Sequence, residues 1–177
     1  MTEKIIIAGS GGQGIMLLGK LLAEAAMQEN LFVTWLPSYG AEVRGGTSHC
    51  MVVISTQEIG SPTIDQADTL IIMNRPSLEK FKHRLVRRGL LIINSSLAPS
   101  YDSPQARVLL HPFTDKAISI GNIRVANVVA LGCYLAEKKI ISLKTVRRLM
   151  REKSKKVGQD LVQMNQRALE EGVKLSW

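Results

Sequence analysis

The sequence predicts an α/β fold: a doubly wound, mostly parallel sheet with helices on both faces and a helical C-terminal third. Two observations support this prediction. Short apolar runs rich in Ile, Leu and Val alternate with segments whose apolar residues recur at helical spacing. The short runs are apolar throughout, which is typical of parallel strands covered on both faces. No internal repeat, low-complexity tract or linker is visible, so residues 1–177 are expected to form a single domain.

The strands are predicted from short apolar runs that are bounded by turn residues. They are residues 4–8, 31–36, 50–54, 69–73, 90–94 and 107–110.

The helices are predicted from spacing and from their end signals. A first helix follows a glycine turn and covers residues 15–28. Pro76 favours the start of a second helix, which Gly89 is expected to end. Thr114 is expected to cap a short helix from Asp115. The remaining helices are predicted at 121–136, after a cap at Ser142, and at 160–171 with Gly172 as the stop.

Length and composition indicate a globular chain in the cytoplasm. The chain has 177 residues, of which 45% are hydrophobic, enough for one domain with a substantial core. No apolar run reaches the roughly 18 residues that a membrane span needs. The first residues lead directly into a strand pattern without signal-peptide features, so no membrane contact is expected.

Cysteine and histidine usage argues against a metal site in this chain. Cys50 and Cys133 lie in apolar surroundings and are expected to be small buried side chains. Two cysteines are too few for an iron–sulfur cluster or a four-thiolate zinc site. His49, His83 and His111 show no ligand spacing, so no bound metal is predicted.

The formal net charge of +8 favours an anionic partner: nucleic acid, a phosphorylated cofactor or an acidic protein. Much of this charge lies in residues 144–156, and a second basic patch lies in residues 80–88. Neither segment has interleaved aromatic residues, which weakens a nucleic-acid interpretation based on base stacking. The alternative for both segments is the solvated face of an amphipathic helix.

A glycine-rich turn joins the first strand to the first helix. It has the Gly-x-Gly-x-x-Gly form, and a helix N-terminus behind such a turn can bind phosphate. A dinucleotide site would also need an acid after the second strand, where residues 34–37 have none. Lys20 comes too late for a P-loop, and the glycines could serve only close helix–strand packing. The candidate binding residues of the turn are Gly9, Gly11, Gly12, Gln13 and Gly14.

The most informative segment is the polar stretch 34–48 between the second and third strands. Loops of this kind often carry function on an α/β scaffold. Arg44 offers a planar guanidinium that can hold a carboxylate or a phosphate through two hydrogen bonds. The alternative is a long surface turn with an ordinary ion pair. The candidate residues are Tyr39, Glu42, Arg44, Gly45, Gly46 and Thr47.

Asn127 is a polar residue inside an otherwise apolar predicted helix. A buried amide without a partner costs on the order of 1–3 kcal/mol, so Asn127 must find one. It is expected either to lock a backbone group elsewhere in the fold or to contact a cofactor or a partner subunit.

Taken together, these motifs resemble the gamma subunit of the 2-oxoacid:ferredoxin oxidoreductases. The resemblance starts at residues 9–15 and is most specific at residues 39–48. It continues through residues 59–62, 67–70, 124–132 and 165–172 in the same order, so it covers essentially the whole chain. The Tyr-Gly-x-Glu-x-Arg-Gly-Gly form is similar to the 2-oxoglutarate, pyruvate and branched-chain 2-oxoacid group. Ala41 is a departure, because proline is common there in the family.

The resemblance implies one non-catalytic subunit of a larger enzyme, inactive alone. Such enzymes oxidatively decarboxylate a 2-oxoacid with coenzyme A to an acyl-CoA and CO2, and reduce ferredoxin. Thiamine diphosphate, Mg2+ and [4Fe-4S] clusters are implied in alpha, beta and, where present, delta partner subunits. The glycine turn, the 39–47 candidates and Asn127 are then expected at the active-site edge, near CoA, or at a subunit interface. The expected oxoacid is 2-oxoglutarate, with pyruvate and 2-oxoisovalerate as alternatives.

Two functions from other classes remain open from the sequence. One is a free-standing nucleotide-binding domain built on the glycine turn. The other is a basic nucleic-acid-binding module, which leaves residues 42–46 without a role. Under the resemblance, neither nucleic acid nor membrane is an expected partner, and the basic segment 144–156 could attract acidic ferredoxin.

Overall fold

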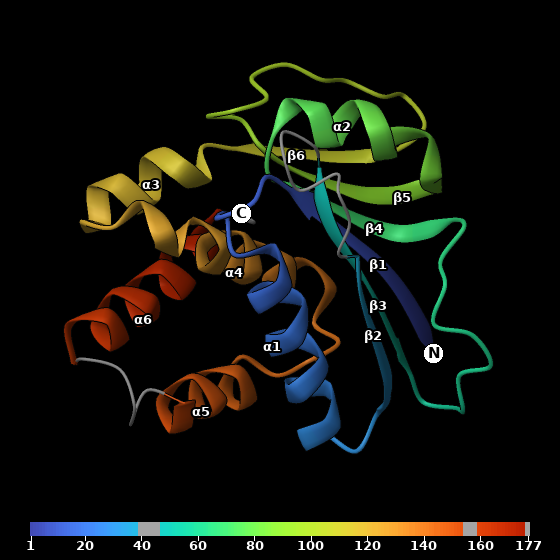
Figure 1. Ribbon diagram of the computed structural model, residues 1–177, viewed down its shortest axis with the longest axis horizontal. Helices are drawn as coiled ribbons and strands as arrows, with labels where there is room; N and C mark the ends of the chain where they lie inside the picture. Colours follow the sequence, from blue (N-terminus) through green and yellow to red (C-terminus); the bar gives the residue numbers. More distant parts are fainter. Residues whose placement is uncertain (39–46, 154–158, 176–177) are drawn as a thin grey trace.

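The computed structural model describes residues 1–38, 47–153 and 159–175, and it contains one sheet with helices packed on it (Figure 1). The strands are β1 (Thr2–Gly9), β2 (Phe32–Ser38), β3 (Ser48–Ser55), β4 (Ala67–Ile72), β5 (Leu85–Asn94) and β6 (Arg107–His111). The helices are α1 (Ile15–Gln28), α2 (Arg75–Phe81), α3 (Phe113–Ile120), α4 (Ala126–Lys138), α5 (Leu143–Lys153) and α6 (Gln159–Lys174). Short 3-10 turns, η2 and η3, cover Lys82–Arg84 and Ile123–Val125.

The sheet has the order β2-β3-β1-β4-β5-β6 and is mostly parallel, which confirms the predicted fold class. Strands β1, β4, β5 and β6 pair in parallel. Strand β3 is antiparallel to both β1 and β2. Only residues 39–47 separate β2 from β3, and a parallel pair would need a crossover of about a dozen residues or more.

Helices cover the two faces of the sheet unequally. On one face, Ile5 and Ile7 of β1 join a large apolar cluster that includes residues of α1, α3, α4, α5 and α6. On the other face, Ile6 and Ala8 join a smaller cluster with residues of α2. Figure 1 shows α2 on the opposite side of the sheet from α1, α4 and α6. Alternate residues of β1 are therefore buried on opposite faces, which explains its uninterrupted apolar sequence.

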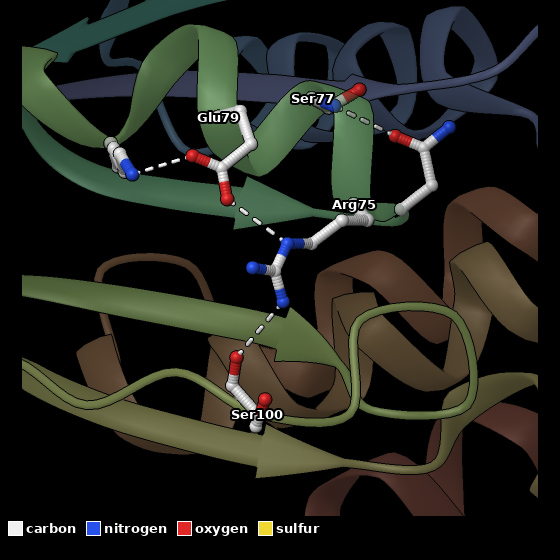
Figure 2. Close-up of polar contacts among 6 residues, drawn as sticks. Arg75, Ser77, Glu79 and Ser100 are labelled. Atoms are coloured by element: carbon white, nitrogen blue, oxygen red, sulfur yellow. Dashed lines mark hydrogen bonds and ion pairs between the residues drawn. The ribbon is translucent and has the colours of Figure 1, made fainter.

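Helix α2 is fixed to the neighbouring loop by a small polar network (Figure 2). Asn74 caps the helix by accepting a hydrogen bond from the Ser77 amide at 3.0 Å. The Arg75 guanidinium pairs with Glu79 at 3.0 Å and donates to the Ser100 carbonyl at 3.4 Å. Arg75 thus joins α2 to the polar segment between β5 and β6.

Several predicted helix boundaries are wrong. The helix opened by Pro76 ends at Phe81, because Leu85 already pairs with Ala67 in the sheet. The helix predicted from residue 121 begins at Ala126, after the short η3 turn. The last helix continues through Gly172 to Lys174, because Gly172 serves a close helix contact and not a helix stop.

The cysteines are buried, as predicted. Cys50 and Cys133 are both fully buried and unpaired. Burial is the main cause that raises the pKa of each thiol to about 12. Such thiols stay protonated and unreactive near neutral pH.

Among the helices that the structure describes, none has the length and apolar character of a membrane span.

A carboxyl group lies in the packed interior at the amino end of β1. Glu3 is only 5% exposed, accepts a hydrogen bond from the Thr69 hydroxyl at 2.6 Å, and pairs with Lys138 at 3.1 Å. Burial raises the pKa of Glu3 above its ordinary value, although Thr69 and Lys138 act in the opposite direction. Desolvation of the charged form therefore outweighs its two favourable contacts.

This raised pKa leads to a prediction about stability and pH. The folded protein keeps the Glu3 proton at pH values where the unfolded chain has lost it, so stability falls as pH rises from about 4.5 through the native pKa. The variant Glu3→Gln is expected to lack this fall. Denaturant unfolding of both proteins across this range measures it.

Glu79→Gln is the matched control. Glu79 is exposed, and its hydrogen bond from Lys82 lowers its pKa, so its stabilising contribution is lost as pH falls. A wild-type profile parallel to that of Glu3→Gln would contradict the prediction.

Candidate functional site

The predicted site elements converge on one edge of the sheet. Parallel strands β1, β4, β5 and β6 all end there, since the carboxyl ends of parallel strands share an edge. Gly9 at the end of β1 lies opposite Ser48, and Ser38 at the end of β2 lies opposite His49. The residues that flank 39–46 therefore lie at the same edge as the glycine turn.

This edge also contains the point where the strand order changes direction. From β1 the chain goes to β2 and β3 on one side, and then to β4 on the other side. In open α/β sheets, ligands bind in the crevice outside the carboxyl ends of strands at such a point. The ends of β1 and β4 are thus the position that this topology favours for a ligand.

The glycine turn is held by the side chain of Gln13. Its Oε1 accepts from the Ser10 amide at 2.6 Å, and its Nε2 donates to the Met73 carbonyl at 3.2 Å. A Cβ on Gly9 would lie 2.6 Å from Gln13 Oε1 and 2.9 Å from Met73 Cβ. Gly9 is therefore required for close packing, which was the alternative for this position. Gln13 links the ends of β1 and β4.

The middle of the turn faces solvent in front of α1. Gly11 and Gly12 are exposed, and Gly12 has a φ of +86° with open space around it. Gly14 caps α1 with a φ of +73° and offers no side chain to the first helical N–H groups. Uncapped N–H groups at a helix N-terminus favour an anionic ligand. One turn donor, the Ser10 amide, is already taken by Gln13, which reduces the fit to a full pyrophosphate.

Asn127 reaches the turn from α4 and is 3% exposed. Its Nδ2 donates to the Gly14 carbonyl at 3.1 Å, which confirms the predicted backbone lock. Because Nδ2 must face this carbonyl, the orientation of the amide is fixed. Its Oδ1 finds no hydrogen-bond partner among the described residues. A contact between Asn127 and a cofactor or a partner subunit stays a prediction.

Two buried asparagines that we did not predict as site residues complete this edge. Asn94 at the end of β5 donates to the Met73 carbonyl at 3.2 Å and to the Thr114 hydroxyl at 2.8 Å. Its Oδ1 accepts from the Thr114 amide at 3.2 Å, so Asn94 and not Thr114 satisfies the start of α3, which begins at Phe113. Asn74 at the end of β4 donates to the Ser10 hydroxyl. The sequence signal that could have identified Asn74 and Asn94 is a polar residue at the end of an apolar run.

The 39–47 candidates are only partly described. Thr47 is 9% exposed, and its hydroxyl has no hydrogen-bond partner within the described ranges. The other candidates of this segment lie outside the described residues, and their roles stay predictions: Tyr39, Glu42, Arg44, Gly45 and Gly46.

Residues 144–153 of the basic segment lie in α5, and residues 154–156 lie outside the described residues. Arg147 pairs with Glu170 at 3.4 Å, and Arg148 donates to Gln28 at 3.1 Å. Lys153 pairs with Glu24 of α1. These contacts support the interpretation that the basic residues form the polar face of α5, which here also pairs with side chains of α1 and α6. In the described part of the chain, no three His, Cys, Asp or Glu side chains are grouped to hold a metal ion.

Comparisons with known proteins agree with this fold. The family model for pyruvate ferredoxin/flavodoxin oxidoreductase matches residues 4–175. A ketoisovalerate oxidoreductase subunit VorA from Methanothermobacter thermautotrophicus is 41% identical over 133 residues, which is 75% of this chain and 28% of that protein. The chain therefore corresponds to well under half of that relative's length.

Two solved structures are similar along almost all of this chain. The gamma subunit of a keto/oxoacid ferredoxin oxidoreductase from Geobacter sulfurreducens has 27% identity and a TM-score of 0.85, with 98% of each chain covered. The 2-oxoglutarate:ferredoxin oxidoreductase from Magnetococcus marinus has 25% identity and a TM-score of 0.90, over 99% of this chain and 31% of that one. These matches confirm the resemblance drawn from the motifs. The chain belongs to the pyruvate ferredoxin/flavodoxin oxidoreductase family.

Proposed function

We propose that this chain is the non-catalytic gamma subunit of a multi-subunit, thiamine-diphosphate-dependent 2-oxoacid:ferredoxin oxidoreductase. The enzyme oxidatively decarboxylates a 2-oxoacid with CoA to an acyl-CoA and CO2, and it passes the electrons to ferredoxin. The observation that carries this proposal is the likeness to the Geobacter gamma subunit over 98% of both chains. In this proposal residues 1–177 form one Rossmann-like gamma domain in the cytoplasm.

The chemistry of the described residues supports a division of labour between subunits. Both thiols are buried and protonated, and the described residues contain no grouped metal ligands. We therefore assign thiamine diphosphate, Mg2+ and the [4Fe-4S] clusters to alpha, beta and, where present, delta partners. When bound there, thiamine diphosphate supplies the decarboxylation chemistry. This chain contributes a polar sheet edge that completes the assembly.

CoA is the anionic ligand that we assign to this edge. The exposed Gly11–Gly12 backbone and the uncapped start of α1 suit a phosphate group. The Magnetococcus enzyme has coenzyme A and succinyl-CoA bound, although this chain matches only 31% of that chain. In the sequence, Arg44 lies between β2 and β3, and its guanidinium would add a two-point contact to phosphate.

For the oxoacid we propose 2-oxoglutarate. The Magnetococcus enzyme, which is structurally similar at a TM-score of 0.90, is a 2-oxoglutarate:ferredoxin oxidoreductase. The VorA relative, at 41% identity, favours 2-oxoisovalerate as the alternative. Pyruvate is the third option, which the family model supports.

The test is anaerobic native purification of the tagged chain from its own host. We expect partner subunits that carry thiamine diphosphate and iron–sulfur clusters to co-purify, and the complex to reduce ferredoxin with an oxoacid and CoA. The oxoacid with the highest kcat/KM then names the substrate. A chain that elutes alone, is inert and binds nucleotides tightly would instead support the free-standing nucleotide-binding alternative.

Arg44→Ala tests the assignment of CoA within the purified complex. We expect the KM for CoA to rise by about ten- to a hundredfold, because removing one partner of a charge-assisted contact costs on the order of 1.5–3 kcal/mol. The KM for the oxoacid should change little. Arg124→Ala, a substitution of an exposed arginine beside α4, is the matched control. Unchanged CoA kinetics in Arg44→Ala would contradict the assignment.

A further inference from the structure

An apolar cavity of about 190 Å3 lies within the helical layer. Four helices contribute its walls: α1, α4, α5 and α6. Its lining includes Leu21, Asn127, Leu131, Met150, Lys153 and Val162. A cavity of about 150 Å3 is enough to bind benzene, so this one can hold an apolar group of about five to seven carbons.

The charge at the opening limits what the cavity can bind. The Lys153 side chain is 43% exposed and therefore lies where the cavity meets solvent. Its ammonium pairs with Glu24, but an ammonium has three N–H donors and can also donate to a second carboxylate. Helix α5 carries five cationic side chains against the single acid Glu152, so its surface favours an anion.

We propose that this cavity binds a small amphipathic carboxylate. Its apolar tail lies between α1, α4, α5 and α6, and its carboxylate pairs with Lys153. The ligand chemistry follows from the size of the cavity, its leucine, methionine and valine walls, and the positive charge at its mouth. No residue of the glycine turn, residues 9–14, lines this cavity, and the proposal does not depend on the proposed function.

The position of Asn127 connects this cavity with the glycine turn. Asn127 lines the cavity, and its Nδ2 also holds the Gly14 carbonyl at 3.1 Å. An occupied cavity therefore restricts a side chain that fixes the start of α1. The amide signals of Gly14 and of the Asn127 side chain are expected to shift when a ligand binds.

The experiment titrates the full chain with sodium hexanoate while methyl and amide NMR signals are recorded. We expect saturable shifts of the Leu131 and Val162 methyl groups in the millimolar range. Hexylammonium, which has the same tail and the opposite charge, should bind at least about tenfold more weakly. Acetate, which lacks the tail, should leave these methyl groups unchanged. Equal binding of hexanoate and hexylammonium would overturn the proposal.

Two pairs of variants locate the ligand. Val162→Trp fills the cavity from α6 and should abolish binding, whereas Gln163→Trp adds the same bulk at an exposed neighbour and should not. Lys153→Gln should weaken hexanoate about three- to tenfold, whereas Lys144→Gln removes an equal charge from α5 away from the cavity and should have no effect. Equal midpoints of thermal unfolding confirm that both tryptophan variants fold. Unchanged binding in Val162→Trp overturns the proposal.

The purified complex provides the last test. The same titration, followed by protection of the complex against heat, should show hexanoate stabilising it and hexylammonium failing to do so. Binding that occurs in the free chain but is lost in the complex would mean that a partner subunit covers the cavity, and it would overturn the proposal for the assembled protein.

Discussion

Gly172→Ala is expected to lower the free energy of unfolding by about 3 kcal/mol, because it places a side chain between two helix backbones. A Cβ on Gly172 would collide with the Val129 carbonyl of α4 and lie 3.0 Å from the Cys133 amide. These are backbone atoms in a buried helix, so they cannot rotate away. The better helix propensity of alanine, about 1 kcal/mol, offsets only part of the cost.

Gly132 of α4 makes the matching close contact with the backbone of α6. A Cβ on Gly132 would collide with the Leu169 carbonyl and lie 3.0 Å from the Gly172 Cα. Gly132→Ala should therefore be destabilising by a similar amount. For a chain of this size, about 3 kcal/mol corresponds to a fall in the midpoint of thermal unfolding of about 6–12 °C.

Gly60→Ala is the control for both substitutions. Its Cβ would have no atom within 4 Å, so its stability should stay within about 0.5 kcal/mol of wild type. Urea unfolding of the three variants measures the differences. Wild-type stability in Gly172→Ala would mean that α4 and α6 separate at little cost, and would contradict close packing at this crossing.

The regular part of the fold could be predicted because its signals are local. The β1 sequence is apolar on both faces, and helix α1 was predicted with its observed bounds, 15–28. The position of the glycine turn between them also followed from the sequence. In each case the hydrophobic period and the flanking residues agree, and no distant contact competes with them.

Predictions failed where a distant contact decides the local structure. Leu85 fits the helical spacing after Leu78 and Phe81, yet it pairs with Ala67 in the sheet. Glycine often ends a helix, yet α6 continues through Gly172, because the backbone of α4 leaves no room for a side chain at this position. A single sequence does not show which backbone lies opposite such a residue.

The candidate site could be predicted in outline but not in its connections. The glycine turn and Asn127 were both recognised, although 113 positions separate Gly14 from Asn127 in the sequence. The bond between them could not be predicted, since it depends on how α4 packs against α1. The roles of Asn74 and Asn94 were missed for the same reason, because their partners Ser10 and Met73 follow other strands.

Gly14→Ala is expected to lower the free energy of unfolding by about 3 kcal/mol through two separate costs. The φ of +73° is in the left-handed region, where an alanine costs roughly 1–2 kcal/mol. Its Cβ would also collide with Asn127 Nδ2 and lie 2.9 Å from Asn127 Cγ. Asn127 can move only by giving up its hydrogen bond to the Gly14 carbonyl, which costs on the order of 1–3 kcal/mol.

Gly12→Ala separates these two costs. Gly12 has a similar φ of +86°, but a Cβ there would have no atom within 4 Å. Only the backbone cost applies, so a loss of about 1 kcal/mol is expected. The difference between the two variants, measured by urea unfolding, is then the energy of the contact with Asn127.

A double-mutant cycle shows whether Asn127 is the cause of that difference. In an Asn127→Ala background the collision is absent, so Gly14→Ala should cost only about 1 kcal/mol, as Gly12→Ala does in the wild type. The two substitutions should therefore couple by about 2 kcal/mol. Additive effects would mean that Asn127 does not hold the turn. Coupling of the expected size would show that α4 fixes the start of α1 and the exposed glycine turn before it.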